Sequence, residues 1–304
     1  MTYKRKNQSD ISIGILDKLT GVHLEMARWS GFIRVVDKAK PGHFKEVQIW
    51  PKEEMKFFFR IRHAVFDRWL ERVGIICMGH HLISADLVEK THNYFSGYKD
   101  DYMAHVEDIR GKYDDHISRW CKKEPGLSHL MNTPQFSKDN ILKKFSFKWN
   151  FFNLAPVKSP LLQKDFFGTI NQLDQILFTE ISCEANVLWE RIFSVRRKIT
   201  PRVAGPIKFL KNKLEGLAFL NPQIESSIKI IEAATLEIPT QQNNDALPAK
   251  LHEKLKNLIW IFKDPELLQS YSQMVYDGAS PLSVLAKAGA QRLLPENQMV
   301  LGTI

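Results

Sequence analysis

Residues 84–123 read SADLVEKTHNYFSGYKDDYMAHVEDIRGKYDDHISRWCKK. Apolar and aromatic side chains recur in this stretch in steps of three or four over roughly eleven helical turns. They form one face: Leu87, Thr91, Tyr94, Tyr98, Tyr102, His105, Ile109, Tyr113, Ile117 and Trp120. Charged residues fill the opposite face, and Ser84 is a suitable N-cap. The helix is expected to end at a stop formed by Lys122, Lys123, Pro125 and Gly126. The stretch predicts one helix on the order of 60 Å long, which projects from its domain or pairs with a second long helix.

A second helix is predicted just upstream, beginning at Pro51. Glu53 and Glu54 fall in its first turn, where the helix dipole favours carboxylates. Its apolar stripe consists of Phe58, Ile61, Val65, Trp69 and Val73. Gly74 is a suitable C-cap, and the short connection to His81 leads directly into the long helix. Two helices joined by so short a loop are expected to lie antiparallel.

Two segments have the patterns of strands. Residues 21–36 contain two apolar runs separated by Trp29-Ser30-Gly31, which predicts a short strand or hairpin. Residues 145–151 alternate aromatic side chains with polar ones, which is the period of a β-strand. We expect these two segments to pair in a small sheet at the base of the helical pair.

The second half of the chain contains several helices that each begin with a capping residue followed by proline. These starts are Ser159-Pro160, Thr200-Pro201, Asn221-Pro222 and Asp264-Pro265. The first helix is predicted to run to about Arg197, which makes it the second long helix. Polar residues between Glu237 and Pro248 predict a linker. A helical pair, residues 249–262 and 265–276, and a weakly patterned tail follow.

The predicted fold is therefore mainly α. Long antiparallel helices form a coiled-coil-like hairpin, accompanied by a small β element and a helical C-terminal region. The predicted domains are residues 1–156 for the small sheet and helical hairpin, residues 157–240 for the long helix and a helical pair, and residues 249–304 for the C-terminal helices and tail.

The composition is that of a folded protein without an evident membrane segment. Hydrophobic residues make up 44% of the 304 positions, and 15 Gly and 14 Pro leave little room for a long disordered tail. No apolar run is long enough to span a bilayer and the start is polar, so we expect a cytoplasmic protein. Cys77, Cys121 and Cys183 are far apart without a CxxC pair, which favours reduced thiols over disulfides or zinc.

The net charge of +9 is most concentrated in residues 191–213, which contain no Asp or Glu. The cations of this basic segment are Arg191, Arg196, Arg197, Lys198, Arg202, Lys208, Lys211 and Lys213. Such a concentration suits a phosphate backbone or an acidic partner. The alternative is that cations stabilise a helix C-terminus, which accounts for Arg196, Arg197 and Lys198 without a ligand. No helix-turn-helix, zinc-finger or RNP-like pattern is present, so sequence-specific reading is not expected.

Other candidate sites have simpler explanations. His80-His81 lies near Cys77, but no further ligand has a suitable spacing, so no metal site is predicted. The aromatic stripe of residues 84–123 could stack on bases, although packing in a core is the commoner role of such a stripe. The GxSxG, P-loop, HExxH and GxGxxG patterns are all missing. We therefore predict no catalytic residue, no cofactor and no metal.

The order of several features resembles an uncharacterised family that carries a domain-of-unknown-function label. The features are Trp29-Ser30-Gly31, a helix ending at Gly74, a second glycine at Gly79, and the long charged helix with Tyr113 and Trp120. The break at Pro125 and the later Phe-rich strand complete the resemblance, which covers residues 21–156. The six residues Trp29, Gly31, Gly74, Gly79, Tyr113 and Trp120 are accordingly candidates for a partner interface.

That resemblance implies a place in a multiprotein system. Members of the family are typically encoded on integrative conjugative elements, plasmids and phages, beside a MoxR-type AAA+ ATPase and a protein with a von Willebrand factor A domain. The implied role is an accessory subunit, a non-enzymatic scaffold or adaptor, with these two proteins as partners. A homo-oligomer is a separate expectation, because the two apolar stripes can be buried either within one chain or between subunits. The alternative is a sequence-nonspecific nucleic-acid-binding protein of a mobile element that uses the basic segment. A hydrolase of unfamiliar type is a third hypothesis, for which no residues are identified.

Overall fold

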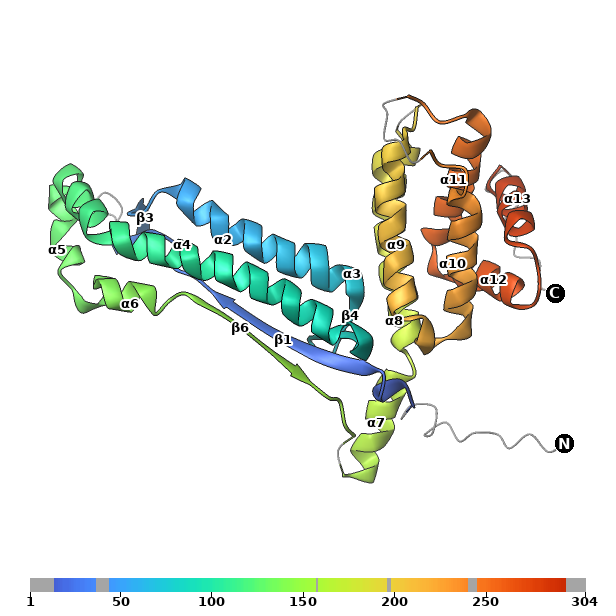
Figure 1. The fold of residues 1–304 in the computed structure, drawn as a ribbon, viewed down its shortest axis with the longest axis horizontal. Helices are drawn as coiled ribbons and strands as arrows, with labels where there is room; N and C mark the ends of the chain where they lie inside the picture. The colour runs from blue at the N-terminus through green and yellow to red at the C-terminus, as the bar shows by residue number, and fades with distance from the viewer. Residues whose placement is uncertain (1–13, 37–43, 157, 196–197, 240–244, 294–304) are drawn as a thin grey trace. The chain divides into compact units, whose positions relative to one another are not determined.

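The computed structural model describes residues 14–36, 44–156, 158–195, 198–239 and 245–293 (Figure 1). The chain is mainly α-helical with a small antiparallel sheet, as predicted. It divides into two compact units. The long-helix unit consists of Val22–Glu71 and Leu87–Phe152, and the bundle unit of Met1–Gly21, Arg72–Asp86 and Asn153–Ile304.

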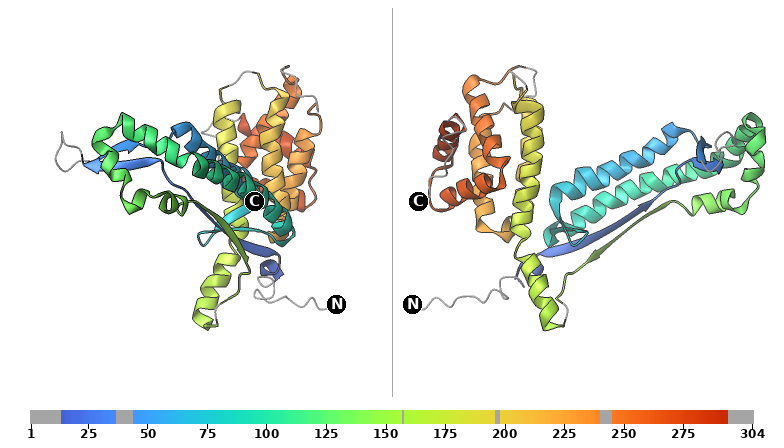
Figure 2. Two further views of the ribbon diagram at one scale, coloured as in Figure 1. Left: turned by 60° about the vertical axis from the view of Figure 1, so that its left-hand side comes forward. Right: turned by 180° about the vertical axis from the view of Figure 1, so that it is seen from behind.

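The long-helix unit is built on α4 (Val88–Lys123), a helix of 36 residues. Five of its buried residues belong to the predicted stripe: Thr91, Tyr102, Ile109, Tyr113 and Trp120. Phe95 and Val106 are also buried but were not predicted, whereas Tyr94, Tyr98, His105 and Ile117 of the predicted stripe are only half-buried. Helix α2 (Lys52–Val65) packs along α4, and the two run antiparallel in Figures 1 and 2. The prediction that Ser84 caps the long helix was wrong, because Ser84 ends a strand and a 3-10 turn, Ala85–Leu87, precedes α4.

Two strand pairs accompany these helices in the long-helix unit. Strands β2 (Phe32–Val36) and β3 (Phe44–Gln48) are antiparallel, with Phe32 opposite Gln48. Strand β1 (Leu19–Ala27) begins in the bundle unit and continues here beside β6 (Ser146–Phe152). This neighbourhood confirms the expected pairing of the two strand segments.

In the bundle unit, the connection after Gly74 is a β-hairpin and not the predicted cap and loop. Strands β4 (Gly74–Cys77) and β5 (His80–Ser84) pair antiparallel, with Gly74 opposite Ile83. Met78 and Gly79 have φ values of 52° and 77°, which match the two-residue turns that follow the twist of a hairpin. The helix before the hairpin continues beyond α2 through a π turn, Phe66–Leu70, and a last turn, Glu71–Val73.

Gly74 is required by a close approach within this hairpin. A Cβ atom at position 74 would lie 2.6 Å from the carbonyl oxygen of Leu82 and 2.9 Å from Cγ2 of Ile83. We expect Gly74→Ala to lower the free energy of unfolding by about 1–3 kcal/mol, because the neighbouring backbone must move. Urea denaturation measures this loss.

Gly97→Ala is the matched control for the Gly74 substitution. Gly97 lies within α4, and nothing lies within 4 Å of the Cβ that the alanine would add. Alanine is the better helix former by about 0.5–1 kcal/mol, so Gly97→Ala should stabilise the protein. Equal losses for the two alanine variants would contradict the close approach at Gly74.

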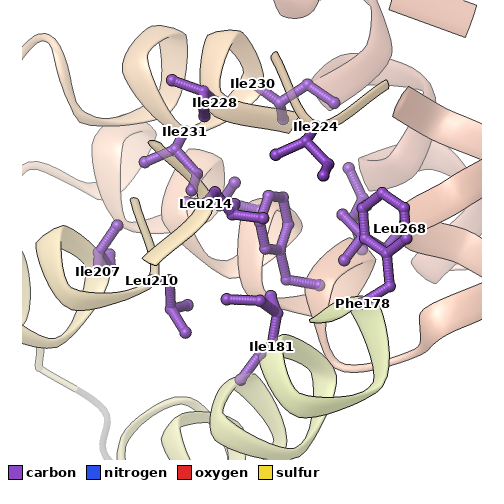
Figure 3. Packing of buried hydrophobic residues seen from close by; sticks show 14 of the residues in the cluster. Phe178, Ile181, Ile207, Leu210, Leu214, Ile224, Ile228, Ile230, Ile231 and Leu268 are labelled. Atoms are coloured by element: carbon purple, nitrogen blue, oxygen red, sulfur yellow. The ribbon is translucent and has the colours of Figure 1, made fainter. Parts of the chain in front are cut away.

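The rest of the bundle unit is a helical bundle. Its helices are α7 (Pro160–Ile170), α8 (Leu173–Leu188), α9 (Ala204–Gly216), α10 (Pro222–Thr235), α11 (Ala249–Phe262), α12 (Pro265–Tyr276) and α13 (Pro281–Arg292). Figure 3 shows the centre of the core, where Phe178 and Ile181 of α8 lie near Leu214 of α9 and Leu268 of α12. These four side chains are at most 1% exposed.

Each of the four predicted starts opens a helical segment, but only two of the capping side chains accept a hydrogen bond, since Ser159 and Thr200 do not. Asn221 accepts a hydrogen bond from the backbone N–H of Gln223, and Asp264 accepts two from Glu266 and Leu267. The tail after residue 276 was described only as weakly patterned, and it contains the helix α13, which was not predicted. Ser280 caps this helix and Pro281 opens it, so the same sequence signal was present there.

The second long helix predicted for residues 159–197 was also wrong. Asn171 and Gln172 separate α7 from α8, and α8 passes into a π turn at Trp189–Phe193. The helix α8 packs inside the bundle unit against α9, α11 and α12. A coiled-coil-like hairpin of two long helices is therefore not confirmed, and the partner of α4 is the shorter α2. None of the described helices combines the length and the apolar character needed to cross a bilayer.

Candidate interaction surfaces

The buried aromatic side chains of α4 pack in the core of the long-helix unit, and their polar groups are hydrogen-bonded. Tyr113 donates a hydrogen bond from its hydroxyl to the carbonyl of Phe136 at 2.5 Å, and the indole N–H of Trp120 donates to Gln48 O at 2.9 Å. The hydroxyl of Tyr102 donates to the carbonyl of Ala27. Burial raises the pKa of Tyr113 to about 12, so this phenol stays protonated at neutral pH. Packing, the simpler of the two explanations, accounts for this stripe.

The six residues predicted for a partner interface are divided between the two units. Trp29, Tyr113 and Trp120 are 3%, 4% and 7% exposed in the long-helix unit. Gly31 of the same unit has a φ of 77°, and its carbonyl accepts hydrogen bonds from the backbone N–H groups of Ile49 and Trp50. Gly74 and Gly79 belong to the hairpin of the bundle unit. In the structure these residues have local structural roles, as buried aromatic side chains or as glycines in turns and close contacts.

The outer face of α4 carries charge along its whole length. Three exposed acidic pairs are spaced two turns apart: Asp100-Asp101, Glu107-Asp108 and Asp114-Asp115. Several of these acids pair with cations, through Glu107–Arg110 at 3.1 Å, Asp108–Lys112 at 2.5 Å and Asp114–Lys138 at 2.9 Å. The structure assigns no ion pair to Asp100, Asp101 or Asp115 among the described residues. This helix offers an accessible polar surface on the order of 50 Å long.

The basic segment separates into accessible and paired cations. Arg191, Lys198, Arg202 and Lys208 are exposed and form no ion pair within the described parts of the chain. Lys211 lies between Glu215 and Glu232, with N–O distances of 3.2 and 2.9 Å. Arg196 and Arg197 lie outside the described residues. The structure therefore brings four of the eight predicted cations to the surface of the bundle unit without an internal partner.

Lys213, the last residue of the basic segment, lies in the interior. It is 4% exposed, and its Nζ donates to Oε2 of Glu180 at 2.6 Å. The other carboxylate oxygen, Oε1, accepts the backbone N–H of Ile76 at 3.1 Å. One side chain of α8 thus joins α9 to the edge strand β4. The sequence gives no signal for this network, because Glu180 is 33 positions from Lys213 and 104 from Ile76.

His81 of β5 lies in the electrostatic environment of the same network. Burial lowers the pKa of its imidazole, Glu180 opposes this effect, and Lys213 and His80 add to it. The lowered pKa means that the folded chain accepts a proton on His81 only at a pH below the ordinary imidazole value of 6.5.

His81 should make the protein less stable at mildly acidic pH. Below pH 6.5 the unfolded chain binds a proton at this position while the folded chain does not, so unfolding is favoured as the pH falls. Urea denaturation between pH 7.5 and pH 5 measures this dependence. The variant His81→Gln should show a shallower decline over the window that starts near pH 6.5, and an unchanged slope would exclude His81 as the cause.

The structure thus defines a class: a two-unit, mainly helical protein with accessible charged surfaces on one long helix and on one bundle. Within the described residues, no group of three or more His, Cys, Asp or Glu side chains is placed to hold a metal ion. The chain belongs to the family described as Protein of unknown function (DUF3150), which it matches over residues 16–250. It matches no curated protein and no solved structure at a significant level. The match agrees with the resemblance to a domain-of-unknown-function family.

Proposed function

We propose that the protein is a non-enzymatic scaffold or adaptor subunit that works in the cytoplasm with a MoxR-type AAA+ ATPase encoded on a mobile genetic element. Only the family resemblance supports the ATPase and the von Willebrand factor A protein as partners. The observation that carries the adaptor role is α4, whose 36 residues have one face buried in the long-helix unit and the other accessible and charged. Long helices of this kind present a large surface to a partner, and packed helices can shift when a motor cycles.

Affinity purification of the full-length tagged protein from its native cell tests this proposal. We expect an AAA+ ATPase to remain bound after nuclease treatment and after washing at moderate salt. Consistent recovery of the protein without any ATPase would refute the adaptor role with this partner.

Charge reversal on α4 locates the contact. Asp100→Lys with Asp101→Lys changes two exposed acids that have no ion pair among the described residues, and it should reduce recovery of the ATPase. The matched control is Glu184→Lys with Glu190→Lys, which reverses two exposed acids of the bundle unit. Equal recovery with both double variants would remove this part of α4 from the interface.

The second candidate function is sequence-nonspecific binding of nucleic acid. It is favoured by Arg191, Lys198, Arg202 and Lys208, which are exposed cations without an ion pair in the described parts of the chain. Neutralised phosphates release counterions, so the affinity for an oligonucleotide should fall steeply with salt. Arg202→Glu with Lys208→Glu should weaken binding and flatten the salt dependence. Lys229→Glu with Lys250→Glu is the control of equal charge, and equal effects of the two double variants would argue against a site in the basic segment.

A further inference from the structure

A pocket of about 560 Å³ lies within the long-helix unit, at the C-terminal end of α4. One side is formed by Ile49, Trp50 and Pro51, which connect β3 to α2. The other side comes from the last turns of α4, including His116 and Trp120. Its volume is within the range of sites that hold small ligands or a few side chains of a peptide.

The apolar wall of this pocket is held by hydrogen bonds and ring contacts. His116 Nε2 donates to the carbonyl of Ile49 at 2.7 Å, and its ring lies 4.4 Å from that of Trp50. Trp120 is fixed by its hydrogen bond to the carbonyl of Gln48. These contacts tie α4 to the β3–α2 connection, so the wall is formed before any ligand arrives.

The rim of the pocket carries three cations, Arg119, Lys122 and Lys123, that differ from the other cations of α4. Arg110 and Lys112 pair with acids of their own helix, and Lys90 and Lys99 lie over Trp69 and Trp149 at 5.5 and 5.4 Å.

The three rim cations make no ion pair within the described residues, and the side chain of Arg119 donates only to the carbonyl of Asp115, at 3.3 Å. Glu124 is the one acid among the residues that line the pocket. Three cations therefore surround a preformed apolar wall with little internal neutralisation.

The helix dipole explains part of this charge but not the pocket. Cations in the last turn of a helix are stabilised by its C-terminal carbonyls, which suits Lys122 and Lys123. Arg119 lies a turn earlier. The apolar wall would add little to the binding of a hydrated inorganic anion, whereas it would bury an apolar side chain.

We propose that this pocket binds an acidic peptide segment of a partner protein, with an apolar or aromatic side chain against Pro51 and His116, the half-buried part of the wall, and carboxylates beside Arg119, Lys122 and Lys123. The site is independent of the identity of the ATPase and of the basic segment of the bundle unit. Carboxylates near these cations would gain charge-assisted hydrogen bonds, and the apolar side chain would add buried area.

A library of random peptides displayed on yeast, selected on the full-length protein, tests this site. The double variant Lys122→Glu and Lys123→Glu serves for counter-selection. We expect the enriched peptides to combine Asp or Glu with an aliphatic or aromatic residue, and to bind the variant about tenfold more weakly, a change of about 1.4 kcal/mol. The double variant Lys143→Glu and Lys148→Glu reverses two exposed cations of the same unit outside the pocket and should keep the affinity of the unchanged protein.

Three results would overturn the proposal. The first is a selection without enrichment of acidic residues, and the second is an equal loss of affinity in both double variants when circular dichroism shows that both are folded. The third is displacement of the peptides by inorganic phosphate or by a short oligonucleotide at lower concentration than by free peptide, which would assign the pocket to phosphate groups.

Discussion

Replacing Lys213 by alanine should lower the free energy of unfolding by about 3 kcal/mol, because it leaves the carboxylate of Glu180 without its cation inside the bundle unit. This value is at the lower end of the range for breaking a buried ion pair, because the side chain of Glu180 is 27% exposed. Urea denaturation of the two proteins at neutral pH measures the difference.

The control for this substitution lies one half-turn away on the same helix. Lys211→Ala removes a cation whose ion pairs with Glu215 and Glu232 are solvent-accessible, so the loss should stay below about 1 kcal/mol. The double variant Lys213→Met and Glu180→Gln removes both charges but keeps an oxygen that accepts the N–H of Ile76. It should regain most of the stability, and a double variant as unstable as Lys213→Ala would show that the ion pair is not the cause.

Trp50→Ala should lower the free energy of unfolding by about 3–5 kcal/mol, which is typical for removing a buried aromatic side chain. Trp50 is 1% exposed, stacks on Tyr113 with ring centroids 6.0 Å apart, and contacts Trp29 at 6.1 Å. Its indole N–H also donates to the carboxylate of Glu54 at 2.9 Å. The substitution therefore removes packing between α4 and the β3–α2 connection and leaves an acceptor without its donor.

Phe44→Ala is the comparison for Trp50. Phe44 begins β3 in the same unit and is 70% exposed, so its truncation should change the stability by less than about 0.5 kcal/mol. Thermal unfolding of both variants compares them directly. A loss below 1 kcal/mol for Trp50→Ala would mean that this aromatic cluster does not hold the end of α4.

Periodicity predicted the helices whose buried faces are regular. The position of α4 followed from its aromatic stripe, and the start of α12 followed from its capping and proline signal. The bounds of α11 were also predicted, although no capping side chain marks its start. The hairpin after Gly74 was missed because a four-residue apolar run resembles the end of a helix. The break at Asn171 was missed because the apolar period continues from α7 into α8, and only packing in the bundle separates them.

The candidate sites were predictable to the extent that they depend on residues close in sequence. The basic segment was visible as a run of cations, but the burial of Lys213 depends on Glu180 of another helix. The pocket at the end of α4 was not visible, because His116 and Ile49 are 67 positions apart. Its cations, Lys122 and Lys123, were interpreted only as the end of a helix.

The path of the chain between the two units has a consequence for synthesis on the ribosome. The chain passes from one unit to the other after Gly21, Glu71, Asp86 and Phe152, so neither unit is a continuous piece of sequence. Ile75 and Leu82 of the hairpin pack in a core that includes Leu16, Leu19 and Cys77, but all its remaining members lie between Ile170 and Ala288. During synthesis the side chains of Ile75 and Leu82 stay exposed until the long-helix unit and the helices that follow it have been translated. A chain stopped at residue 152 would keep those side chains uncovered, which makes such nascent chains natural clients for chaperones.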